Sequence, residues 1–348
     1  MGHAIPRSST VTDRRDNVWL NRFAWLSVVA TLLLICSGGM VTSKGVGLAV
    51  PDWPTTFGYN MFLFPVSKWI GGVFFEHTHR LIASTVGMLA VILAVWLWFA
   101  ESRHWVRTLG LAAVGAVILQ GILGGLRVTM LKDQIGIFHA CLAQAFFALM
   151  VVIALVTSRF WREQVAAIRD GKLLRPIALL TTVLVYVQLT LGATMRHQHR
   201  DLSITDFPTA YGQWIPDTSP AAIATINAAR DRVGMSDVSA AQIWLQMAHR
   251  FGAVLIAVGV IWFFLSVHRG KIPPLRRLST AWLIGVFVQI GLGAWTIWSN
   301  KAADIATTHV AVGATMLGFG AIICAFCFRR IEIPVSPTHQ LRSDPAIV

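Results

Sequence analysis

Eight long apolar runs divide the sequence, and each is long enough to cross the hydrocarbon core of a bilayer. A helix needs about 20 apolar residues for this crossing. In lipid, a helix or a closed barrel is what satisfies the backbone hydrogen bonds. The composition agrees, since 55% of the residues are hydrophobic and 13% are charged. We therefore expect an all-α polytopic membrane protein. Its helices should lie near residues 20–42, 76–100, 106–127, 136–158, 176–196, 242–265, 277–298 and 306–328.

Several motifs occur twice at constant spacing. His249-Arg250 follows His79-Arg80 by 170 residues, and a second pair of histidines, His139 and His309, is also separated by 170 residues. The segments 47–58 and 201–212 match at a spacing of 154. Tandem repeats of this kind are typical of polytopic membrane proteins. The sequence thus predicts eight transmembrane helices arranged as two tandem pseudo-symmetric four-helix bundles.

The domain boundaries follow from this repeat, and the change of spacing places an insertion in the second half. The expected parts are an N-terminal cytoplasmic tail (1–19), a first half (20–158), a cytoplasmic linker (159–175), a second half (176–328) with its insertion near 213–241, and a C-terminal cytoplasmic tail (329–348).

The net charge of +13 is informative through the positions of the lysine and arginine residues along the chain. Lysine and arginine gather in the two tails and the short loops of one side, which the positive-inside rule assigns to the cytoplasm. Anionic lipid headgroups are a sufficient partner for them, and no nucleic acid is expected. No cleavable signal peptide precedes the first run, which favours a bacterial plasma membrane. With both termini cytoplasmic, the second, fourth, sixth and eighth helices begin on the outer side.

Each of those four helices carries a histidine in its first turns: His79, His139, His249 and His309. A buried ionisable side chain in a membrane helix is a functional candidate, although a single histidine could simply hydrogen-bond between helices. Zinc or copper would need further protein ligands that do not repeat with the histidines. Two imidazoles facing each other in a bundle suit axial ligation of haem iron. We expect one haem per half, on His79 with His139 and on His249 with His309.

The two halves differ beside these histidines. Glu76 precedes His79 by three residues, whereas Gln246 precedes His249. A carboxylate near a haem edge could act as acid, base or charge stabiliser; alternatively, Glu76 could only cap the helix start. Arg80 and Arg250 would flank the macrocycle, where pairing with propionates is one role for them.

The outer segments carry further signals. The aromatic-rich segment 43–75 is either an interfacial belt or a lid over an apolar ligand. Asp52 and Asp206 recur as turn or capping residues. Arg127 and Arg196 either reach the headgroups or pair with a ligand carboxylate.

The insertion and its surroundings give local predictions. The Ala-rich stretch 220–232 is expected to form a short surface helix, and Ser239 with Gln242 has the spacing of a capping box. His197 and His199 are expected to be solvated loop residues rather than metal ligands. Cys324 and Cys327 are expected to be buried small residues without a redox role.

On these motifs, the Glu-x-x-His-Arg run at Glu76–Arg80 and the histidines at 139, 249 and 309, the chain resembles the haem A synthase family over about residues 20–328. The resemblance implies an oxidoreductase that converts the C8 methyl of haem O into the formyl group of haem A for terminal oxidases. It implies that His79 and His139, with Arg80, hold the substrate haem. His249 and His309, with Arg250, would hold haem b, and Glu76 would be needed for turnover.

The resemblance also implies binding partners, and the sequence departs from some family members at one point. Haem O is the substrate, and haem O synthase, terminal oxidase assembly factors and a second copy of the chain are candidate partners. Some bacterial members carry a cysteine pair in the first external loop. This sequence has no cysteine between Val41 and Phe75, so no thiol role is expected there.

Two rival functions remain open at this point. A bis-haem membrane cytochrome b that transfers electrons from quinol also needs four histidines, but it gives no reason for an acid in one half alone. A transporter built from a repeated bundle is the second rival. Haem content and product analysis distinguish the three.

Overall fold

The computed structural model describes residues 17–163, 174–198, 202–270 and 272–329. Within these residues, eight helices are long and apolar enough to cross a membrane, and β-structure is limited to two isolated bridges. The predicted all-α fold with eight spans is confirmed. The eight helices are α1 (Val18–Ser43), α2 (Gly71–Ala100), α3 (His104–Met130), α4 (Asp133–Val156), α6 (Leu174–Gln198), α8 (Ala240–Arg269), α9 (Pro273–Trp298) and α10 (Ala303–Phe328).

Shorter helices lie between the spans: η1 (Met61–Leu63), η2 (Val66–Lys68), α5 (Arg159–Glu163) and α7 (Pro220–Asp231). The predicted surface helix is confirmed as α7, whose first turn is capped by Ser219. The predicted capping box at Ser239 and Gln242 is also present and starts α8. The helix α5 lies at the start of the segment 159–175 that we predicted to be a linker.

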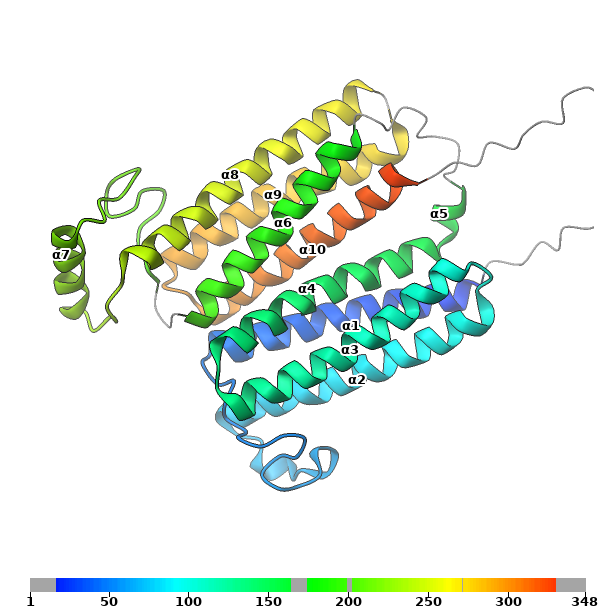
Figure 1. The fold of residues 1–348 in the computed structure, drawn as a ribbon, viewed down its shortest axis with the longest axis horizontal. Coiled ribbons are helices and arrows are strands. Elements are labelled where there is room, and N and C mark those ends of the chain that lie inside the picture. Colours follow the sequence, from blue (N-terminus) through cyan, green and yellow to red (C-terminus); the bar gives the residue numbers. More distant parts are fainter. Residues whose placement is uncertain (1–16, 164–173, 199–201, 271, 330–348) are drawn as a thin grey trace, which may run out of the picture.

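The helices pack in two groups of four, which Figure 1 shows as a lower group of α1 to α4 and an upper group of α6, α8, α9 and α10. Within each group every helix contacts two others in cyclic order. Between the groups, α10 contacts α1 and α4, and α4 also contacts α6. These contacts are those that we expect of two tandem four-helix bundles.

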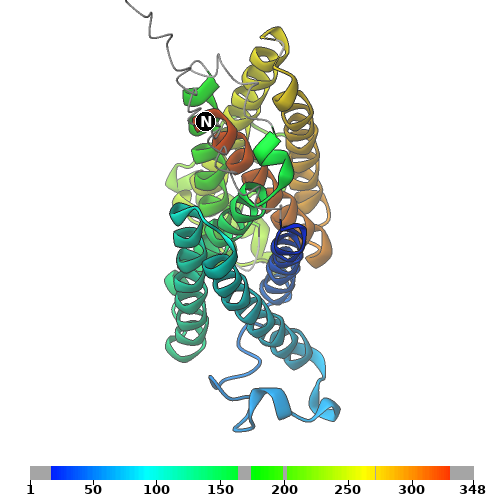
Figure 2. The ribbon, with the colours of Figure 1, turned by 90° about the vertical axis from the view of Figure 1, so that its right-hand side faces the viewer.

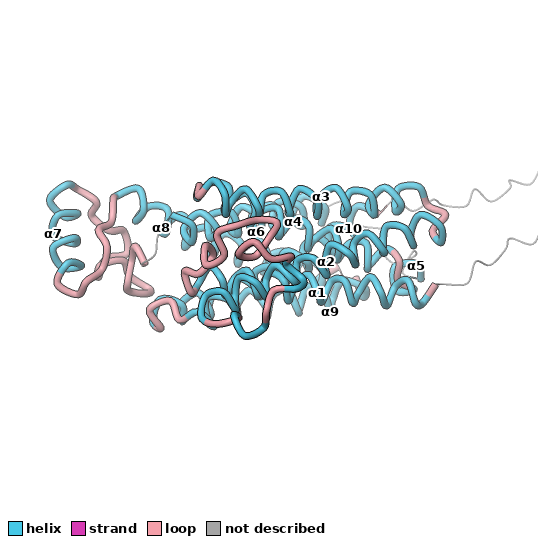
Figure 3. Tube along the Cα trace, turned by 90° about the horizontal axis from the view of Figure 1, so that it is seen from below, coloured by secondary structure: helices cyan, strands magenta, loops and turns pink. Residues whose placement is uncertain are grey.

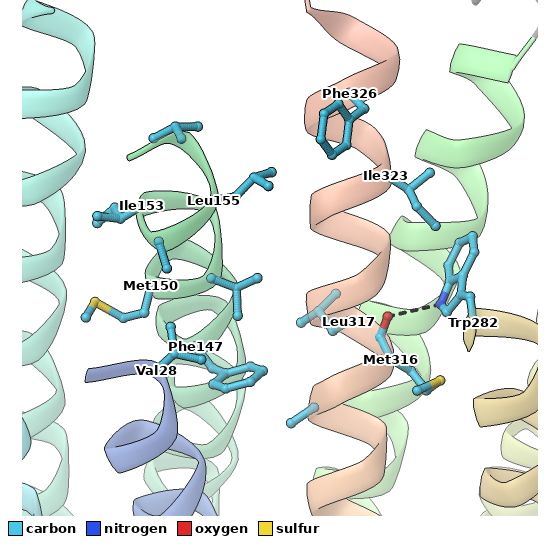
Figure 4. Packing of buried hydrophobic residues seen from close by; sticks show 14 of the residues in the cluster. Val28, Phe147, Met150, Ile153, Leu155, Trp282, Met316, Leu317, Ile323 and Phe326 are labelled. Atoms are coloured by element: carbon cyan, nitrogen blue, oxygen red, sulfur yellow. Dashed lines mark hydrogen bonds between the residues drawn. The ribbon is translucent and has the colours of Figure 1, made fainter. Parts of the chain in front are cut away.

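Buried apolar side chains line both α4 and α10 (Figure 4). Met150 and Ile153 of α4 and Ile323 of α10 are fully buried. The indole of Trp282 in α9 donates a hydrogen bond to the carbonyl of Met316, at 3.1 Å. Lipid is as apolar as these side chains, so close packing rather than exclusion of water holds membrane helices together. The contact between α4 and α10 therefore joins the two groups of helices.

The two ends of the molecule differ. Segment 44–70, which includes η1 and η2, lies at one end, as does α7, and Figure 2 shows the segment extending beyond the helices. At the opposite end lie α5, the first residues of α1 and the last residues of α10 (Figure 3). The four histidines lie in the early turns of α2, α4, α8 and α10, at the end that also carries segment 44–70 and α7.

Candidate functional site

Each of the four histidines lies against a glycine of a neighbouring helix. A Cβ atom added to the glycine would meet the imidazole Cε1 at 2.9–3.4 Å, which is tighter than most real contacts. Each ring therefore rests in a recess at a glycine: at Gly38 a Cβ atom would force the His79 ring to shift, and at the other three glycines it would make a tight contact. The pairs are His79 with Gly38, His139 with Gly124, His249 with Gly192, and His309 with Gly293.

Three of these glycines follow a glutamine by one helical turn, and each glutamine fixes the backbone of the facing histidine. The side-chain amides of Gln120, Gln188 and Gln289 donate to the carbonyls of His139, His249 and His309, at 3.1, 2.7 and 2.9 Å. In α1 the corresponding residue is Leu34. Gln120 and Gln289 lie in similar segments of the two halves, 119–125 and 288–294, to which the histidine repeat alone assigns no role. The third copy, Gln188 with Gly192, is the signal that would have indicated one.

His249 and His309 face each other across their group of helices, with ring centroids 6.4 Å apart and planes inclined by 65°. Metal–imidazole bonds are about 2.0–2.1 Å long, so one iron between two trans imidazoles would set the ring centroids roughly 6 Å apart. The Nδ1 atoms of both rings are buried and have no hydrogen-bond partner among the described residues. The pair fits bis-histidine ligation of haem iron.

His79 and His139 form the corresponding pair in the first group. Their Nδ1 atoms are also buried without a partner among the described residues. The same recess and the same free ring nitrogens make this pair suitable for a second haem iron.

Glu76 is 4% exposed, and both of its oxygens are hydrogen-bonded. One accepts the backbone N–H of Val50 at 2.9 Å, and the other accepts the guanidinium of Arg80 at 2.8 Å. Gln246 makes the equivalent backbone contact: it accepts from the N–H of Ile204 at 2.8 Å and donates to its carbonyl at 3.1 Å. We call segments 44–70 and 202–219 the external segments, after the side of the membrane predicted for them. The amide of Gln246 attaches the second external segment as well as the carboxylate of Glu76 attaches the first. This attachment therefore gives no reason for a charge at position 76.

Arg80 and Arg250 hold the external segments onto their helices. Arg80 donates to the carbonyls of Asp52, Thr55 and Val50, at 2.7, 3.1 and 2.9 Å. Arg250 donates to the carbonyls of Asp206 and Thr209, at 2.6 and 2.8 Å. The structure therefore gives these arginines a positioning role, and the pairing of either one with a propionate stays a prediction.

Asp52 and Asp206 are turn residues, as the sequence predicted. Asp52 accepts hydrogen bonds from the Thr55 hydroxyl and from the N–H groups of Phe57 and Gly58. Asp206 does the same with Thr209, Tyr211 and Gly212. Phe57 and Gly58 have φ angles of 50° and 77°, a left-handed turn that Asp52 stabilises from inside.

This turn should resist moderate acid. Burial acts to raise the pKa of Asp52, but the hydrogen bonds from Gly58, Thr55 and Phe57 outweigh it and lower the pKa below its ordinary value. The stabilisation is thus complete above the unfolded pKa of about 3.9, and it is lost as the pH falls through the lower folded value. We expect hydrogen exchange of residues 52–58 to be protected equally at pH 8 and 5, and to lose protection below about pH 4. Asp52→Asn should lack this acid transition, and a loss of protection between pH 8 and 5 would contradict the assignment.

His77 is a site residue that sequence analysis did not single out. It is fully buried, its Nδ1 lies 3.2 Å from the Thr56 hydroxyl, and its ring packs against Phe64 and Trp69. At the corresponding positions of the second half stand Met247 and Ala210, which are both buried in an apolar cluster. The first external segment is thus attached by a polar pair where the second is attached by apolar packing.

Two residues near the sites differ from expectation. Arg196 does not reach toward headgroups: it donates to the carbonyl of Gly39 and the hydroxyl of Ser43 in α1, at 2.7 and 2.5 Å. His197 was expected in a solvated loop, but it lies in the last turn of α6, half-buried against Gly136 of α4. The reason is that α6 continues past the expected end at residue 196 and docks between α1 and α4. His199 lies outside the described residues.

A comparison with known families gives a match over most of the chain. The model of the COX15-CtaA family, described as cytochrome oxidase assembly protein, matches residues 21–320. The chain belongs to the COX15-CtaA family. The matched residues include all four site histidines and Glu76.

Curated relatives of this COX15-CtaA chain carry the name "Heme A synthase". The protein of Shouchella clausii is 27% identical over 71% of this chain and 75% of its own length. Those of Lysinibacillus sphaericus and Shewanella oneidensis are each 25% identical, over 87% and 86% of this chain and 94% and 93% of their own lengths. All three relatives are bacterial, and the last two match over more than nine tenths of their own length.

Proposed function

We propose that this protein is a haem A synthase, an oxidoreductase that converts the C8 methyl of haem O into the formyl group of haem A for terminal oxidases. The proposal is carried by one observation: two histidine pairs lie in similar surroundings, and only the pair at His79 lies beside a buried acid. Relatives named for this activity support it. We place the protein in a bacterial plasma membrane, with both termini cytoplasmic and both haem sites toward the outer side.

In this proposal, His79 and His139 bind the iron of the substrate haem O, and His249 with His309 binds haem b as the resident cofactor. Each imidazole rests against a glycine of a neighbouring helix and has an Nδ1 atom without a partner among the described residues. These surroundings fit both haems. When bound, haem b would supply one-electron redox chemistry. Conversion of a methyl group into a formyl group with oxygen from water releases four electrons and four protons, so an external electron acceptor is required.

The protein's own residues position the substrate and handle protons. Glu76, held by Arg80 and by the Val50 N–H, is the group that takes a proton as the methyl group is oxidised. Gln120 fixes the backbone of His139 and thereby the direction of its ring. Arg80 attaches the external segment, so that the methyl edge of the porphyrin is shielded from the outer aqueous phase.

The test is pigment analysis of membranes that contain the protein together with a source of haem O. Chromatography of the extracted haems should show haem A, and membranes without the protein should show haem O alone. A bis-haem cytochrome b would leave haem O unchanged, and a transporter would purify without a Soret band. Either result would reject the proposed activity. Transfer of haem O from its synthase and delivery of haem A to oxidase assembly factors are further expectations of this proposal.

A further inference from the structure

An apolar groove lies between α1 and α2, with a volume of about 300 Å³, at the lower end of ordinary ligand pockets, about 300–1,000 Å³. It is open along one side rather than enclosed. Six residues line it: Ala30, Leu33, Leu81, Ile82, Thr85 and Val86.

The groove continues from the His79 site. Ile82 and Val86 follow His79 by three and seven residues, so all three lie on one face of α2. On α1, the recess for the His79 ring is at Gly38, and Leu33 lies between one and two turns further from the outer end. A flexible chain attached to a porphyrin at His79 would therefore meet the groove next.

The second half carries larger residues at several of the corresponding positions. At the positions that correspond by spacings of 154 and 170 residues, Leu184 replaces Ala30, Phe251 replaces Leu81 and Leu255 replaces Thr85. Gly252 replaces the larger Ile82, but the side chain of Gln188 lies directly against Gly252. The difference between the halves lies in this lateral space, because the recess that receives the ring is the same in both.

We propose that the groove between α1 and α2 binds the long isoprenoid side chain of haem O. This inference rests on the proposed function and explains why the groove adjoins the substrate pair: haem b carries a short vinyl group where haem O carries its isoprenoid chain. Lipid solvates such a chain as well as protein does, so the groove contributes close packing and orientation. A fixed chain sets the rotation of the porphyrin about the iron–His79 bond and thereby determines which ring methyl faces Glu76.

The test variant replaces three groove residues by their counterparts from the second half: Ala30→Leu, Leu81→Phe and Thr85→Leu. We call it the filled variant, and it is made in the full-length protein with haem b bound. A control variant, Val91→Phe, adds bulk on α2 at a position that is 45% exposed and lies on a different face from Leu81 and Thr85. Binding of haem O and of protohaem, which lacks the isoprenoid chain, is measured by Soret absorbance. The haem b spectrum reports whether each variant is folded, and Thr85→Leu alone is a milder substitute if the triple variant is not.

We expect the filled variant to bind haem O about tenfold more weakly than the wild type, with protohaem binding unchanged and the control unaffected. Equal haem O binding by the wild type and the filled variant would overturn the inference and identify the groove as a site for a lipid acyl chain. Equal losses of haem O and protohaem would also overturn it, because the substitutions would then act on the histidine site itself. A wild type that binds no haem O would reject the proposed function as well, so the two failures are distinguishable.

Discussion

Glu76→Gln is expected to stop haem A formation while the protein still folds and binds both haems. The general base that the variant lacks is worth about 10²–10⁴ in rate. The fold should survive because Gln246 already makes the equivalent backbone contact, to Ile204, with an amide. Arg80 would lose its ion pair but keep its bonds to three carbonyls of the external segment. The measurement is haem A formed per protein, determined by chromatography of the extracted pigments.

The second half provides the matched control. Gln246→Glu places an acid at the corresponding position, where Arg250, four residues later, is able to pair with it. Haem b content and haem A formation should stay within a few-fold of the wild type, since no chemistry is assigned to that site. Normal haem A output from Glu76→Gln would show that Glu76 only attaches the external segment.

His249→Ala and His309→Ala are each expected to remove nearly all of the haem b, and product formation with it. Each substitution deletes one of the two imidazoles that face each other at 6.4 Å, and alanine offers the iron no ligand. His79→Ala should retain the haem b spectrum and instead lose bound haem O. The measurement is the reduced-minus-oxidised spectrum, together with haem b and haem O per purified protein.

A gentler change at the same site serves as its control. Gln188→Leu removes the hydrogen bond to the carbonyl of His249 but leaves both imidazoles in place. Leu34 occupies the corresponding position in α1, so leucine is compatible with the recess at the next glycine. This variant should keep its haem b. If His79→Ala and His249→Ala lost the same haem to the same extent, the assignment of substrate and cofactor to separate halves would be wrong.

The helices were predictable because the bilayer sets the length of each apolar run. Most observed ends lie within a few residues of the expected ones. The start of α2 at Gly71 lies five residues before the expected position 76. Gly71 has a φ of 55°, so the chain turns sharply there and the helix begins at once. The short helix α5 was missed because its polar and aromatic residues resemble an interfacial linker.

The histidines of the site were predictable because they repeat, but their surroundings were only partly so. The contact of Glu76 with Val50 joins residues 26 positions apart, and no local pattern indicates it. The fixation of His77 by Thr56 is also a long-range contact. The recesses at the glycines could have been found, because the glutamine one turn before the glycine appears in three helices. Local spacing thus identified the four candidate ligands, whereas the attachment of the external segments required the folded chain.

The hydrogen bonds from Arg196 to Gly39 and Ser43 mean that the two halves of the chain are not interchangeable. The spacing of 154 residues places Thr42 of α1 opposite Arg196 of α6, so the first copy has no guanidinium to offer in return. These hydrogen bonds are therefore donated by the second half to the first, without an equivalent pair in the reverse direction at the corresponding position. A protein built from two first halves would therefore lack these two hydrogen bonds between its halves.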